Sequence, residues 1–82
     1  MARIVKNKDI LGGKPCIEGH RISVLHIWDV IESGGTVRDI TETVYPYLTE
    51  DEVRTALRYI YENAEEVSEM KNERDEYREQ FD

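Results

Sequence analysis

The chain has 82 residues, a net charge of −7 and a single cysteine, and its length suits one small domain. Such a domain buries roughly 60% of the surface that its unfolded chain exposes, so we expect a marginal core that a homodimer or a permanent partner stabilises. The lone Cys16 excludes an intramolecular disulfide, and the lack of a long apolar run excludes a membrane span and a signal peptide, which together predict a soluble cytoplasmic protein.

The first third of the chain predicts short β structure interrupted by a loop. The stretch "ARIV" (2–5) is β-prone, and "NKDILGGKP" (7–15) is rich in residues that favour turns. The stretch "CIEGHRI" (16–22) predicts two short strands that reverse at Glu18 and Gly19, because glycine adopts positive φ there. A two-stranded ribbon is marginal alone, so we expect it to lean on helices or pair with another chain.

Two capped helices are predicted next. Ser23 suits the N-cap of the first helix, and "SGG" (33–35) ends it. Its apolar stripe consists of Val24, Ile27, Trp28 and Ile31. Thr36, with Asp39 three residues later, opens the second helix, and Pro46 ends it. The buried face of this second helix consists of Val37, Ile40 and Val44.

A third helix begins at Thr49, which forms a capping box with Glu52. Its apolar stripe consists of Val53, Ala56, Leu57, Ile60, Ala64 and Val67. No stop signal follows, so we expect one uninterrupted helix to the end of the chain. The predicted fold is mainly α: short N-terminal strands or a hairpin, then a three-helix bundle of helix-turn-helix size with an extended C-terminal helix. We place the domain at 1–66 and an acidic helical tail at 67–82.

The residues that could take part in catalysis or metal binding lack the partner residues that such sites require. The loop "GGKP" (12–15) has neither the second glycine nor the hydroxyl of a phosphate-binding loop. Cys16, His20 and His26 have the spacing C-x3-H-x5-H, but His26 falls a turn inside a helix and a structural zinc site needs a fourth ligand. Catalysis by Cys16 would need a base, which His20 could supply from across the turn, but nothing supplies an oxyanion site or a substrate pocket. We therefore expect no enzyme activity, no metal and no cofactor.

Nucleic-acid binding is predicted from a basic head over residues 1–21. The candidate DNA contacts are Arg3, Lys6, Lys8, Lys14 and Arg21, with Arg54 and Arg58 of the third helix. Glu50, Asp51 and Glu52 make the start of that helix acidic, which argues against its insertion into the major groove. The alternative is that these bases are scattered, solvated surface residues.

The acidic tail carries a sparse apolar stripe. Its candidate partner contacts are Val67, Met70, Arg74, Tyr77, Arg78 and Phe81. A helix this charged buries itself weakly, so we expect it to dock on a partner protein. A coiled-coil seam between two copies is the alternative, with Arg74 disrupting one layer.

The stretches "ILGGKPCIEGHRISV" and "IESGGTVRDITETVYPYLTEDEVRTALRY" resemble the DUF433 family over about residues 4–62. The chain departs from the family pattern at His20, where threonine is usual, and at Cys16, where a larger aliphatic residue is usual. The resemblance implies a homeodomain-like three-helix domain with a small N-terminal β element. It also implies similarity to VapB-type antitoxins, whose genes lie beside those of PIN-like ribonuclease toxins.

From this resemblance we expect a prokaryotic, cytoplasmic antitoxin of a type II toxin–antitoxin module. It would neutralise a PIN-like toxin protein and, as a homodimer, bind operator DNA. Arg74 and Arg78 would then pair with nuclease carboxylates, and Tyr77 and Phe81 would anchor the contact. The alternative is a dimeric protein–protein adaptor that does not bind DNA.

Overall fold

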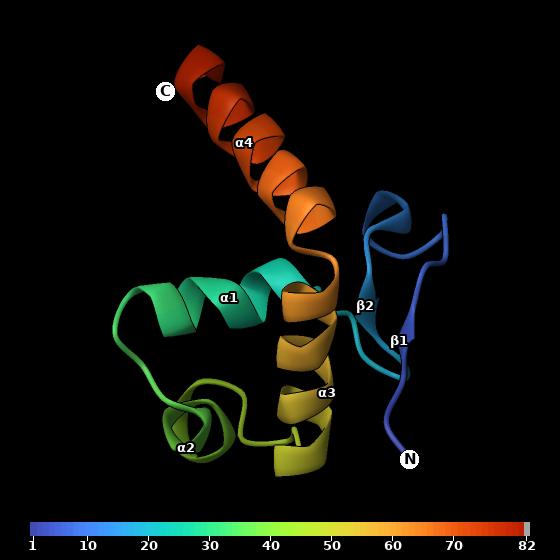
Figure 1. Ribbon diagram of the computed structural model, residues 1–82, viewed down its shortest axis with the longest axis vertical. Helices are drawn as coiled ribbons and strands as arrows, with labels where there is room; N and C mark the ends of the chain where they lie inside the picture. Colours follow the sequence, from blue (N-terminus) through green and yellow to red (C-terminus); the bar gives the residue numbers. More distant parts are fainter. Residues whose placement is uncertain (82) are drawn as a thin grey trace.

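The computed structural model describes the backbone of residues 1–81 and the side chains of residues 1–78. In chain order the elements are β1 (Ile4–Val5), η1 (Leu11–Gly13), β2 (Cys16–Ile17), α1 (Val24–Glu32), α2 (Val37–Asp39), η2 (Ile40–Val44), α3 (Glu50–Glu62) and α4 (Ala64–Phe81). The fold is mainly helical with a short N-terminal β ribbon, which confirms the predicted fold class (Figure 1).

The ribbon is built from the two ends of the first loop. β1 pairs antiparallel with β2, with Ile4 opposite Ile17. The chain reverses after β2 as predicted, and Gly19 adopts a φ of 88° there. The predicted second strand of this reversal is wrong, because it is reduced to an isolated bridge between Cys16 and Ser23. Ser23 caps α1 directly afterwards, which leaves too few residues for a strand.

Three N-caps are confirmed, and each is a complete capping box. In each box the side chain of the N-cap residue accepts a hydrogen bond from the backbone N–H of the residue three positions later. The side chain of that later residue accepts one from the backbone N–H of the N-cap residue. The pairs are Ser23 with His26, Thr36 with Asp39, and Thr49 with Glu52. His26 is unusual in this role, since its imidazole nitrogen replaces the usual carboxylate oxygen.

The second helix is shorter and wider than predicted. After one α-helical turn in α2 the chain continues as the π-helical segment η2, in which the Tyr45 N–H donates to the Ile40 carbonyl at 2.8 Å. Pro46 follows the end of this segment, as predicted. Ile40 is fully buried, but Val44 is 43% exposed, so the prediction that Val44 is buried is wrong. The wider π turn shifts the later residues off the face that an α-helical spacing predicts.

The expected uninterrupted third helix is also wrong, because the chain breaks at Asn63. This residue has φ −126° and ψ 42°, outside the helical region. Both its backbone N–H and its side-chain amide donate to the Tyr59 carbonyl, at 2.9 and 3.1 Å. Asn63 thus ends α3, and α4 restarts in a new direction, in contact with α1 and extending away from the body (Figure 1).

The core is formed by residues from the ribbon and all the longer helices. Its buried hydrophobic members are Ile17, Ile22, Val24, Leu25, Ile27, Ile40, Leu48, Val53, Ala56, Ile60 and Val67. Val67 is 4% exposed, so the first turn of the predicted tail belongs to the core of the body. In the described part of the chain, no helix combines the length and apolar character needed to cross a membrane.

Candidate functional site

The basic residues predicted to contact DNA do not form one uniform group. Three of them form ion pairs with acidic neighbours: Arg3 with Glu18, Lys6 with Glu66, and Arg54 with Glu50. The others, which form no ion pair with any described side chain, are Lys8, Lys14, Arg21 and Arg58. Part of the predicted basic head is therefore neutralised within the chain itself.

The predicted tail residues divide between the body and the solvent. Arg74 forms a two-pronged ion pair with Asp29 of α1, with N–O distances of 2.8 and 3.0 Å, and its side chain is only 16% exposed. The hydrogen bond to Asp29 raises the pKa of Arg74 above its ordinary value. Lys71 also reaches α1, where its Nζ lies 2.7 Å from a Glu32 oxygen. These two ion pairs hold the middle of α4 against α1.

The remaining tail residues continue this division. Val67 is buried, and Met70 packs against the core. Tyr77 and Arg78 are exposed. The side chain of Phe81 lies outside the part of the chain that the structure describes.

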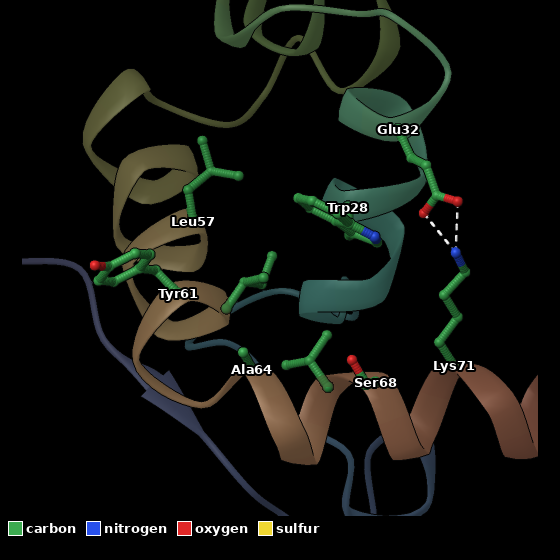
Figure 2. A pocket seen from close by; sticks show the side chains of 9 residues that line it. Trp28, Glu32, Leu57, Tyr61, Ala64, Ser68 and Lys71 are labelled. Carbon is green, nitrogen blue, oxygen red and sulfur yellow. Dashed lines mark hydrogen bonds and ion pairs between the residues drawn. The ribbon is translucent and has the colours of Figure 1, made fainter.

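The break at Asn63 opens a groove of about 590 Å³ between α1, α3 and α4. Its lining residues are Trp28, Glu32, Leu57, Ile60, Tyr61, Ala64, Val67, Ser68 and Lys71. Figure 2 shows Trp28 of α1 facing Leu57 of α3, with the Tyr61 ring directed outward from α3, while α4 passes beneath them with Ala64 and Ser68. Three helices thus supply the walls, and the lining is mostly apolar.

The polar edge of the groove is formed by the ion pair between Glu32 and Lys71 (Figure 2). Because these two charges satisfy each other, they supply neither a free general base nor a free cation. Tyr61 stands at the opposite wall with 86% of its surface exposed, although it is a large aromatic residue. Exposed aromatics beside a concave apolar surface are typical of protein-binding sites. The arrangement can hold apolar side chains of another protein.

Each of the three candidate metal-ligating or nucleophilic residues contacts a different group. Cys16 is buried, and its thiol donates to the Val5 carbonyl at 3.6 Å. His20 Nε2 lies 2.8 Å from a Glu52 oxygen, while His26 is held in the cap of α1. Among the described residues, no three side chains of ligand type come together as a metal site.

The structure brings together one group that the sequence did not predict. Lys14, His26, Arg74 and Arg78 line a second cleft of about 300 Å³. The sequence places Lys14 in the basic head, which predicts DNA contact, and the two arginines in the acidic tail, which predicts contact with a protein partner. The break at Asn63, which turns α4 toward the loop, is what unites them.

The model of the family described as "Protein of unknown function (DUF433)" matches residues 4–60. The chain belongs to the DUF433 family. No curated protein and no solved structure gives a significant match. The DUF433 match runs from β1 almost to the end of α3 and leaves α4 outside it. Two walls of the groove, α1 and α3, therefore belong to the segment that matches DUF433, and the third wall, α4, comes after that segment in the sequence.

Proposed function

We propose that this DUF433 chain is a protein-binding module that acts as the antitoxin of a type II toxin–antitoxin pair. The observation that carries the proposal is the apolar groove between α1, α3 and α4, with the exposed Tyr61 on its wall. A surface of this kind costs free energy while it faces water, and a partner's apolar side chains remove that cost.

The choice of partner comes from the resemblance of the sequence motifs to antitoxin-like chains. A cytoplasmic PIN-like ribonuclease would place apolar side chains between Trp28 and Leu57. The outer turns of α4 would then lie along the toxin surface, because α4 extends beyond the body in Figure 1. Toxin inhibition would result from steric cover, with α4 held in position by Arg74 and Asp29.

A dimeric protein adaptor that does not bind DNA is the second candidate. The ion pairs of Arg3, Lys6 and Arg54 favour it, because side chains already paired with carboxylates contribute less to phosphate contact. Both candidates use the groove for protein binding. They differ in whether the bound protein is a nuclease that the chain inhibits and in whether operator DNA is bound.

Nuclease inhibition by matched tyrosine variants tests the proposal. The product of the gene next to that of this chain, which the proposal expects to be a PIN-like ribonuclease, is assayed for ribonuclease activity with wild type, Tyr61→Ser and Tyr47→Ser. Both tyrosines are exposed, but Tyr47 lies outside the groove. We expect Tyr61→Ser to weaken inhibition about tenfold, as for a typical interface anchor, and Tyr47→Ser to leave it unchanged.

A wild-type chain that binds this protein without lowering its activity would support the adaptor instead. Equal inhibition by wild type and Tyr61→Ser would remove the groove from the mechanism.

A further inference from the structure

A second cleft lies where the η1 loop, the first turn of α1 and the outer half of α4 meet. Its volume is about 300 Å³, and it shares no lining residue with the apolar groove. Lys14, His26, Arg74 and Arg78 supply most of its polar lining. Among the described side chains, no carboxylate lines it. The cleft is therefore a local concentration of positive charge in a chain whose net charge is −7.

The three cations of the cleft differ in how they are held. Arg74 is fixed by Asp29 and also has Asp75 near its Nε, at 3.6 Å, so nearby carboxylates offset its charge. Lys14 and Arg78 form no ion pair with a described residue. The unpaired charges of Lys14 and Arg78 repel each other and that of Arg74. An anion bound in the cleft would attract all three and offset this repulsion.

His26 supplies a further hydrogen-bond donor rather than a further charge. Its Nδ1 accepts the Ser23 N–H at 3.0 Å, so the neutral ring carries its proton on Nε2. Burial lowers the pKa of His26 from 6.5, and the charges of Arg74 and Lys14 add to this effect against that of Asp29. At neutral pH the ring is therefore an uncharged donor in the cleft lining.

The loop that carries Lys14 is built in an uncommon conformation. Leu11, Gly12 and Gly13 all have positive φ, at 53°, 66° and 84°. Positive φ is unfavourable for leucine, and such strain persists where the surrounding structure maintains it. The Lys14 N–H closes this turn by donating to the Leu11 carbonyl at 3.3 Å. Lys14 has extended backbone itself and directly follows this defined turn.

From this cleft we infer that the chain binds a phosphate group between Lys14, His26 and Arg78. The donors come from three separate segments, the η1 loop, α1 and α4, and so approach from different directions. A tetrahedral oxyanion has acceptor oxygens on all sides, whereas a planar carboxylate matches a single guanidinium. The volume, at the small end of ligand pockets, leaves space for a small group attached to the phosphate.

Titration of the full chain with inorganic phosphate, at constant ionic strength, tests this inference. Amide NMR should show saturable shifts in residues 11–14, 23–26 and 74–78. We expect Lys14→Gln and Arg78→Gln each to weaken binding about tenfold, the effect of losing one charge-assisted hydrogen bond. The matched controls, Lys8→Gln and Arg58→Gln, remove the same charges outside the cleft and should change affinity less than about twofold.

Further probes distinguish the source of the phosphate group. Tighter binding of adenosine 5′-monophosphate than of phosphate supports a nucleotide-sized ligand. Tighter binding of a short DNA duplex, lost in Lys14→Gln, supports backbone phosphates at the same cleft. Acetate binding as tight as phosphate would overturn the assignment in favour of a partner's carboxylate. The absence of saturable binding, or equal weakening in the control variants, would overturn the site itself. None of these outcomes depends on toxin inhibition.

Discussion

At the scale of single residues, Glu52 joins two parts of the fold. One carboxylate oxygen accepts the Thr49 N–H at 2.9 Å and completes the cap of α3. The other lies 2.8 Å from His20, in the turn that follows β2. The backbone hydrogen bond from Thr49, followed by the contact with His20, lowers the pKa of Glu52 from its ordinary value of 4.5. One side chain therefore fixes the helix start and ties the ribbon turn to it.

Two substitutions at Glu52 should separate its cap from its charge. Glu52→Ala should lower the free energy of unfolding at neutral pH by about 1 kcal/mol, the usual value of a lost cap contact. Glu52→Gln replaces the carboxylate with an amide, whose oxygen still accepts a hydrogen bond but which does not titrate. Because the folded pKa is lowered, the stability from ionised Glu52 is present above about pH 4.5 and is lost as pH falls through the folded pKa.

Urea unfolding at neutral pH and at progressively lower pH measures both effects. The acid-induced loss of stability should be smaller in Glu52→Gln than in wild type. The same substitution at Glu42, whose ion pair with Arg38 is exposed, is the control and should leave the pH profile unchanged. An identical acid profile for wild type and Glu52→Gln would show that this carboxylate does not couple folding to pH.

At the scale of elements, local signals were predicted well and tertiary ones were not. The caps at Ser23, Thr36 and Thr49 depend on side chains within three residues, so sequence spacing suffices to find them. The π turn of η2 and the break at Asn63 are different, because the apolar stripe runs on through both segments. Asparagine is a weak helix former, but Asn63 alone gives a weaker signal than the apolar stripe that continues past it.

The candidate sites were missed for the same reason. Leu57 and Ala64 were assigned to one face of one helix, whereas the break makes them parts of two groove walls. The second cleft joins Lys14 to Arg78 across most of the chain, a proximity that spacing alone does not reveal. Each site depends on the new direction of α4, and hence on a single residue whose effect the sequence pattern concealed.

The role of α4 as part of the body gives a prediction at this scale. Val67→Ala should lower the free energy of unfolding by about 2 kcal/mol, because Val67 is 4% exposed and its removal leaves a cavity. The matched control is Val44→Ala in η2, where the valine is exposed and the loss should stay below about 0.5 kcal/mol. Chemical denaturation of both variants measures the difference. Equal effects would mean that α4 contributes little to the core and functions as a separate tail.

At the scale of the whole molecule, surfaces remain that one chain does not cover. The outer edge of β1 has no neighbouring strand among the described residues, whereas the second edge of β2 bonds to residues 22–24. The apolar groove is a second such surface. A domain of this size buries a limited fraction of its surface, and association with another chain adds to it. These features favour an oligomer, while the charge of −7 on each chain opposes one.

We therefore predict a homodimer at micromolar concentrations whose affinity increases with salt. Two like-charged chains repel each other, and salt screens this repulsion beyond a Debye length of about 10 Å at 0.1 M. Added salt should therefore weaken the repulsion and leave the apolar contact intact. Analytical ultracentrifugation over a range of salt concentrations measures this. The Tyr61→Ser variant then locates the interface: if it dissociates, the dimer covers the groove and a partner must compete with dimerisation. A dimer that persists in Tyr61→Ser would use the ribbon edge and leave the groove open to a partner. A chain that stays monomeric at every salt concentration would contradict the prediction.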